Sequence, residues 1–165
     1  MTKIPSYILL IGLAICSSFT SSPSEDPSAS KYKCLIQLSN YTGEGPYIVV
    51  SVLDGDQQYL GSVQVLGEDE EWYEDITEWW KYMEESKPEI DAITRPSIPA
   101  GSRAVFVLTI KDEWIDAGNH IRFETAVEDQ KYVKDDILLP LTSETLNGKF
   151  EGSGYIRYIR LIPNK

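Results

Sequence analysis

The chain has 165 residues, with 26 acidic and 15 basic side chains and a net charge of -11 at neutral pH. This balance argues against a nucleic-acid-binding protein and against electrostatic binding to anionic lipid, because both require clustered lysine and arginine. An acidic, solvated exterior is the favoured interpretation. Steering toward a cationic partner is the alternative.

Residues 1–20 have the layout of a secretory signal peptide. One early cation, Lys3, precedes the apolar run 8–15, and small polar residues follow it. The run is shorter than the roughly 20 apolar residues that a transmembrane helix needs. We therefore expect an exported protein of the periplasm or cell envelope.

Cys16 lies at the end of this leader, and two interpretations of it remain open. Residues 13–18 resemble the lipobox of bacterial lipoproteins, in which the cysteine is lipidated, although Ile15 stands where that motif has a small residue. Ordinary cleavage among residues 17–22 is the alternative, and a lipid anchor is the one membrane contact we expect. In either case Cys34 has no intramolecular partner, so we predict no disulfide and a buried thiol.

The rest of the chain predicts one all-β domain. Residues 21–31 are rich in serine and proline and are predicted to be a disordered linker, and residues 32–165 are expected to form a single domain. Segments rich in β-branched and aromatic residues are predicted strands: 33–38, 47–53, 59–66, 103–110, 119–127, 132–139 and 155–162. About seven short strands indicate an immunoglobulin-like antiparallel β-sandwich with one inserted amphipathic helix.

Two details of the strand pattern are specific enough to test. In 119–127, Ile121 and Phe123 alternate with Arg122 and Glu124, which predicts a strand buried on one face and exposed on the other. The segment 54–56, Asp-Gly-Asp, predicts a hairpin turn in which glycine supplies the positive φ. Residues 43–46 and 148–154 are predicted loops.

The segment 72–88 breaks the strand pattern and predicts a helix. Trp72, Ile76, Trp79, Trp80 and Met83 recur at helical spacing on one face, while the acidic residues lie elsewhere. Either these tryptophans cap one end of the core, or one of them, Trp80 or Trp79, lines a ligand groove.

Motifs for catalysis are scarce in this chain. It has one histidine, His120, which excludes a multi-histidine metal site. A pair of carboxylates would support glycoside hydrolysis, but with 26 acidic residues chance pairs are inevitable. No phosphate-binding glycine loop or Cys-x-x-Cys motif is present. We therefore expect a non-enzymatic protein without a metal site.

Several short blocks carry a family resemblance. They are residues 45–54, Trp72 with the pair Trp79 and Trp80, residues 91–96, and residues 123–124 with 155–157. In this order, over residues 33–161, they resemble DUF2271, a family of predicted periplasmic proteins. The resemblance implies an exported domain that occurs beside PepSY-type membrane proteins and flavin transferases, and hence a part in extracytoplasmic flavin-linked electron transfer.

The resemblance also implies a flavin site in residues 91–96. Many members carry an Asp-x-x-Thr-Gly-Ala-Thr-like segment before Arg-Pro, in which a threonine hydroxyl takes FMN, and Thr94 matches that acceptor. Aligned on Thr94, this chain has Ala92 in place of the glycine and Asp91 in place of the first threonine. The favoured interpretation is an ordinary turn without cofactor, in which Asp91 or Thr94 bonds its own backbone, and FMN on Thr94 is the alternative.

Three functions remain open. The first is a non-enzymatic partner of a PepSY-type membrane redox protein, docking through the acidic surface and the aromatic helix. The second is a ligand- or glycan-binding sandwich that stacks its ligand on tryptophan. The tryptophans available for that role are Trp72, Trp79, Trp80 and Trp114. The third is a hydrolase that uses paired carboxylates.

Overall fold

The structure is a computed structural model that describes residues 28–164. The predicted signal peptide and Cys16 lie outside the described residues, as does most of the predicted linker. Strand β1 begins at Ala29, so the last residues of the range 21–31 belong to the fold. Within residues 28–164 no helix is long and apolar enough to cross a membrane.

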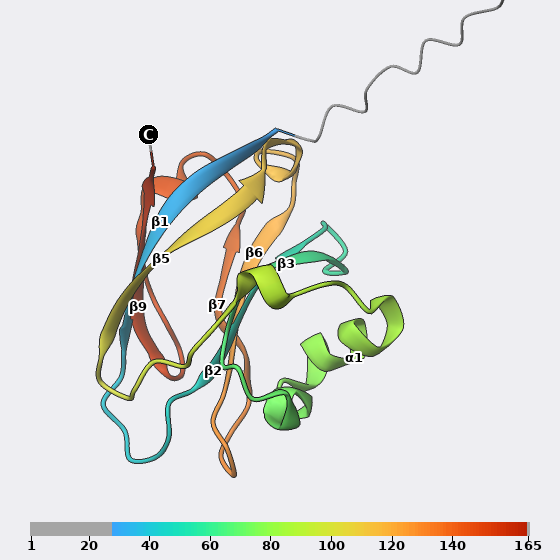
Figure 1. Cartoon of the computed structure of the whole chain (residues 1–165). Helices are drawn as coiled ribbons and strands as arrows, with labels where there is room; N and C mark the ends of the chain where they lie inside the picture. Colours follow the sequence, from blue (N-terminus) through green and yellow to red (C-terminus); the bar gives the residue numbers. More distant parts are fainter. Residues whose placement is uncertain (1–27, 165) are drawn as a thin grey trace, which may run out of the picture.

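The strands form two sheets, which confirms the predicted all-β sandwich (Figure 1). The four-stranded sheet has the order β5 (Arg103–Lys111), β1 (Ala29–Leu38), β9 (Ile156–Pro163) and β8 (Lys149–Glu151). The five-stranded sheet has the order β4 (Thr94–Arg95), β3 (Tyr59–Leu66), β2 (Tyr47–Leu53), β6 (His120–Ala126) and β7 (Val133–Pro140). All pairings are antiparallel except that of β3 with β4, which is parallel. Strand β8 lies within residues 148–154, which were wrongly predicted to be loop.

The main core lies between the two sheets. Alternate residues of β1, β5 and β9 meet those of β2 and β6 there, among them Ile36, Val50, Leu108 and Phe123. Alternate side chains of a strand point to the same face, so each strand contributes one row of apolar side chains to this core. Their burial offsets part of the conformational entropy that the chain loses on folding. Cys34 belongs to this core as a buried free thiol, as predicted, and its burial raises the pKa of the thiol.

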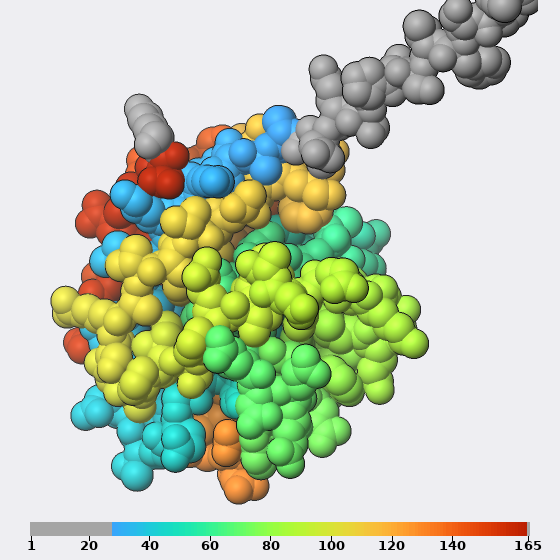
Figure 2. Space-filling view, viewed as in Figure 1, coloured from blue at the N-terminus to red at the C-terminus, as the bar shows by residue number. Residues whose placement is uncertain are grey.

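A second hydrophobic layer covers the outer face of the five-stranded sheet. Residues 67–102, between β3 and β5, are called the insertion, and their side chains between Trp72 and Ile93 form this layer. Ile98, near the end of the insertion, belongs to the main core instead. The insertion contains the 3-10 helix η1 (Glu70–Asp75), helix α1 (Thr77–Ser86), the 3-10 helix η2 (Asp91–Ile93) and β4. Tyr73, Ile76 and Trp79 pack against Val49 and Val65 of the sheet. Figure 2 shows the insertion, in green to yellow-green, as one contiguous lobe.

Burial under the insertion changes the character of β2 and β6. Every residue of β2 is buried, and in β6 every residue after His120 is buried. The prediction of a half-exposed strand at residues 119–127 was therefore wrong. Arg122 and Glu124 do alternate with the core residues, but their side of the sheet is covered by protein rather than by water.

The predicted helix is divided into two parts. The break lies at Ile76, with φ -88° and ψ 69°, so η1 and α1 are separate and Trp72 belongs to η1. Helix α1 ends at Lys87, which has a left-handed φ of 44° and donates its N–H to the carbonyl of Met83. Pro88 follows directly and cannot continue the helix. Two further 3-10 helices are η3 (Asp112–Trp114) and η4 (Thr145–Asn147).

The predicted hairpin turn joins β2 to β3, but glycine is not the residue with positive φ. The Asp54 Oδ1 accepts the backbone N–H groups of Asp56, at 2.9 Å, and Gln58, at 2.8 Å. Gln57 takes the left-handed conformation, with φ 65°. An aspartate that bonds the backbone two residues on favours this type of turn. The turn brings the Gln57 side chain near the start of β6, where its Oε1 accepts a hydrogen bond from Arg122.

Candidate functional site

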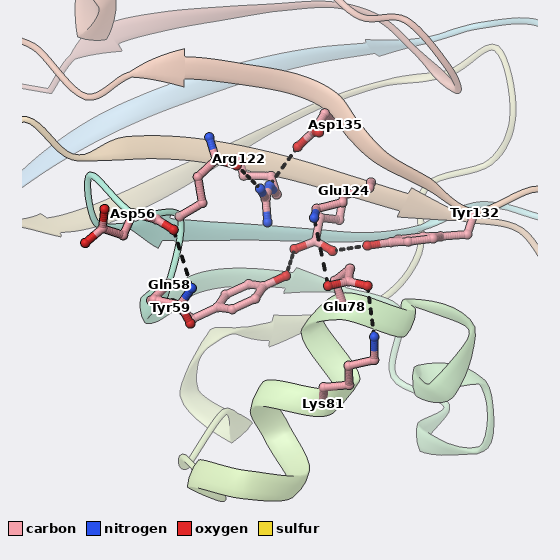
Figure 3. Close-up of polar contacts among 11 residues, drawn as sticks. Asp56, Gln58, Tyr59, Glu78, Lys81, Arg122, Glu124, Tyr132 and Asp135 are labelled. Carbon is pink, nitrogen blue, oxygen red and sulfur yellow. Dashed lines mark hydrogen bonds and ion pairs between the residues drawn. The ribbon is translucent and has the colours of Figure 1, made fainter.

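A buried polar cluster lies on the sheet beneath one side of α1 (Figure 3). The Glu124 carboxylate, on β6, accepts two hydrogen bonds. The Tyr59 hydroxyl donates to Oε1 and the Tyr132 hydroxyl donates to Oε2, each at an oxygen–oxygen distance of 2.5 Å. Tyr59 begins β3 and Tyr132 directly precedes β7, so the three side chains join three strands of one sheet. Glu124 is 0% exposed. We call Tyr59, Arg122, Glu124 and Tyr132 the tyrosine–glutamate network.

Electrostatics keep both phenols of this network as hydrogen-bond donors. Burial raises the pKa of Tyr59 and of Tyr132, and the nearby carboxylate of Glu124 raises both further. Burial also raises the pKa of Glu124, while the two phenols and Arg122 act in the opposite direction. A buried carboxylate is tolerated when its oxygens accept strong hydrogen bonds, and both oxygens do so here.

Arg122 extends the network toward the surface. It is 1% exposed, and its Nη2 donates to the Gln57 Oε1 at 2.8 Å. Its Nε lies 2.8 Å from the Asp135 Oδ1, a close ion pair whose angle is not that of a hydrogen bond. The guanidinium also lies 5.8 Å from the centre of the Tyr59 ring. A buried arginine is thus compensated by one exposed acid, one amide and one aromatic face.

A polar cleft of about 460 Å³ opens beside the network, between α1 and the β2–β3 turn. Tyr59 and Tyr82 stack along it, with ring centres 5.0 Å apart. Glu78 lines the cleft, and a 3.0 Å hydrogen bond from Lys81 lowers the pKa of its carboxyl. Glu124 lies behind Tyr59 with both oxygens engaged. It is therefore not placed to act as a general acid on a ligand in the cleft.

A second hollow, which we call the insertion groove, lies on the other face of α1. It encloses about 480 Å³. Its apolar side chains include Trp80, Met83 and Ile90, and acidic residues stand around them. The residues that line it are Glu70, Tyr73, Trp80, Met83, Glu84, Lys87, Pro88, Glu89, Ile90 and Asp91. A half-buried tryptophan in an acid-rimmed groove suits recognition of an apolar group that carries positive charge.

The structure separates the four tryptophans proposed for ligand binding. Trp79 is 0% exposed, and its Nε1 donates to the Ser62 Oγ at 2.8 Å, so it is a core residue rather than a stacking platform. Trp72 packs against the same inner layer. Trp114 packs on the main core, with the Lys111 Nζ 4.7 Å from its ring. Of the four, Trp80 alone lines the insertion groove.

Thr94 and Asp91 lie beside one another at the edge of the insertion. The Thr94 hydroxyl donates to the carbonyl of Ile90 at 2.9 Å, as in an ordinary turn. A cavity of about 240 Å³ next to it is also lined by Glu68, Glu70 and Asp91. These carboxylates would repel the phosphate through which FMN is attached, so the residues present do not fit that group well. No cluster of three or more metal-ligating side chains occurs within residues 28–164.

Buried tyrosines make the fold sensitive to alkaline pH. Burial raises the pKa of Tyr41 and of Tyr47 to about 12, and raises the pKa of Tyr59 and Tyr132 further. A phenol whose pKa is higher in the folded state stabilises the fold fully below its unfolded pKa of about 10, and this contribution is lost above it. We expect the urea midpoint to fall as the pH rises from about 10 to about 12, the pKa of Tyr41 and Tyr47 in the folded state. The double variant Tyr59→Phe/Tyr132→Phe should show a shallower fall, and an equally steep one would contradict the assignment.

Comparison with known proteins identifies the family. A family model described as a predicted periplasmic protein, DUF2271, matches residues 29–158. No curated protein and no solved structure matches the chain. The match covers eight of the nine strands, the start of β9 and the whole insertion, and its description agrees with the export expected from the leader. The chain belongs to the DUF2271 family of predicted periplasmic proteins.

Proposed function

We propose that this protein is a non-enzymatic accessory domain of a membrane-bound, flavin-linked redox system, and that it docks on a PepSY-type membrane partner through the insertion. The observation that carries the proposal is the concentration of negative charge on the insertion. Its acidic residues are Glu68, Asp69, Glu70, Glu71, Glu74, Asp75, Glu78, Glu84, Glu85, Glu89 and Asp91. Residues 68–91 contain only two cations, Lys81 and Lys87.

The insertion groove supplies a specific contact within this charged surface. Acidic residues steer a cationic partner and raise its association rate, but exposed charges alone hold it weakly. Trp80 and Met83 offer an apolar anchor of the kind that carries most of the energy in protein interfaces. The groove therefore fits a partner segment that combines lysine or arginine with one or two apolar side chains.

The buried network supports an accessory role rather than an enzymatic one. The most deeply buried carboxylate, Glu124, serves two tyrosine hydroxyls, and those phenols are held protonated. The network secures three strands of the sheet on which α1 rests. It thereby gives the insertion a rigid base.

The test is a binding measurement between the exported protein and a PepSY-type membrane protein in detergent. Trp80→Ala should weaken binding by about tenfold or more, as expected for an interface anchor. Glu84→Gln/Glu89→Gln should slow association at low salt. Trp114→Ala and Glu113→Gln are matched controls outside the groove and should bind normally. Binding that is absent, or that groove and control variants weaken equally, would overturn the proposal.

Trp80 also favours a second candidate function, the binding of a neutral glycan. A sugar ring stacked on its exposed face could bond to Glu84 or Glu89 at the rim. The two functions differ in their response to salt, because stacking on a neutral sugar is barely screened whereas charge-steered docking is. Quenching of tryptophan fluorescence by a neutral oligosaccharide, unchanged by salt and lost in Trp80→Ala, would favour the glycan.

A further inference from the structure

A polar pocket lies on the four-stranded sheet, away from the insertion. Strand register places Arg103, Gln37, Tyr158 and Glu151 in one row across β5, β1, β9 and β8. This row lines a pocket of about 450 Å³, to which Lys149 and Arg157 also contribute. We call it the basic pocket.

A β-bulge brings Arg157 into the basic pocket. Gln37 pairs with Tyr158 and Leu38 with Ile156, so Arg157 is the extra residue between two pairs. A bulge of this kind re-aims a side chain that regular alternation would send to the other face. As a result the neighbours Arg157 and Tyr158 both line the same pocket.

The cations of the basic pocket are positioned but not neutralised. Gln37 is 8% exposed and is held by its bonds to the carbonyls of Leu38 and Gly101, each at 2.9 Å. The Gln37 Oε1 accepts a hydrogen bond from the Arg103 Nε, which leaves the two Nη groups of that arginine for a ligand. The Lys149 Nζ lies 4.2 Å from the centre of the Tyr158 ring. Within the described chain, Arg103, Lys149 and Arg157 form no ion pair with an acid, although acids outnumber bases in the sequence.

We propose that the basic pocket binds a phosphate group. Its three cations and the single carboxylate of Glu151 leave two positive charges, which match the charge of about -1.5 to -2 on a phosphate monoester at neutral pH. Arginine presents a planar fork that bonds phosphate oxygens in pairs, and lysine adds a point charge. A carboxylate ligand, with one negative charge, would leave the pocket half neutralised.

Two sources of the phosphate are consistent with the surface. One is a soluble phosphosugar. The other is the phosphate monoester headgroup of phosphatidic acid, because Val105 and Val107, on the same strand as Arg103, are 60% and 37% exposed and would face the acyl region. The two sources share one recognition chemistry and differ in the use of these valines.

The test uses the exported protein and glucose 6-phosphate in isothermal titration calorimetry. We expect one site, weakened by salt, with affinity reduced about tenfold in Arg157→Gln and in Lys149→Gln. Glu151→Gln should bind more tightly, because it removes the one repelling charge. Arg95→Gln, on β4 of the other sheet, is the matched control and should bind normally.

A second arm uses vesicles that contain phosphatidic acid, whose headgroup is a phosphate monoester, with phosphatidylcholine vesicles for comparison. Binding to phosphatidic acid that glucose 6-phosphate inhibits and Val105→Ser/Val107→Ser weakens would identify a lipid source. Binding of the sugar phosphate without vesicle binding would identify a soluble one. If neither probe binds, or if Arg95→Gln reduces affinity as much as Arg157→Gln, the proposal is wrong. Because the basic pocket and the insertion lie on different sheets, neither outcome bears on the proposed docking function.

Discussion

Replacing Glu124 by alanine is expected to lower the free energy of unfolding by about 3–5 kcal/mol. The variant leaves the hydroxyls of Tyr59 and Tyr132 without their acceptor in a buried site. It also removes a compensating negative charge near Arg122, which is 1% exposed. Urea unfolding followed by far-UV circular dichroism measures the loss.

Conservative variants separate the hydrogen bonds of Glu124 from its packing. Glu124→Gln keeps the shape and one acceptor oxygen, so it should lose less than Glu124→Ala. Tyr59→Phe and Tyr132→Phe each delete one bond and should each cost about 1–2 kcal/mol. If Glu124→Ala unfolds at the same urea concentration as the parent protein, the network does not hold the sheet together.

Replacing Trp79 by alanine is expected to cost about 3–5 kcal/mol, because it empties a large volume in the inner layer of the insertion. Trp79 is 0% exposed and packs edge-on against Tyr73, with ring centres 5.2 Å apart. The loss should detach the insertion first, since its apolar contacts with β2 and β3 depend on this ring. Hydrogen exchange should then show faster exchange in α1 than in β1 or β9.

Trp80→Ala is the matched control for this effect. Trp80 is the next residue on α1, but it is only partly buried and lines the insertion groove. Its removal should cost about 1–2 kcal/mol and leave exchange in α1 slow. Equal destabilisation by the two variants would contradict the assignment of Trp79 as core and Trp80 as a recognition residue.

The two proposed binding surfaces lie on different sheets and differ in the sign of their charge. The insertion, on the five-stranded sheet, carries most of the acidic excess and an apolar groove. The four-stranded sheet carries three cations and one carboxylate around the basic pocket. A net charge of -11 conceals this asymmetry, because a sum over the sequence contains no positions.

The tyrosine–glutamate network was not predicted, although its four residues all lie in predicted strands. Arg122 and Glu124 were placed on a solvent-facing side because polar residues that alternate with apolar ones usually face water. Tyr59 and Tyr132 are 73 positions apart in the numbering and meet only because β3 and β7 flank β2 and β6 in one sheet. A contact between residues so far apart in the sequence leaves no signal in a local sequence pattern.

The sequence by itself determined the seven longer strands, the turn after β2, the buried Cys34 and the presence of an amphipathic segment, because each depends on short-range periodicity or turn chemistry. It missed the short strands β4 and β8. It also carried the family resemblance through the order of its short blocks. Only the tertiary structure decided which faces of the strands are buried from solvent. The insertion folds back over β2 and β6, so Glu124 and Arg122 become buried and Trp79 becomes core, while pairing between distant strands gathers Arg103, Lys149 and Arg157 around one pocket. Burial is a property of the neighbours that pack against a residue, and those neighbours are set by contacts far apart in the chain.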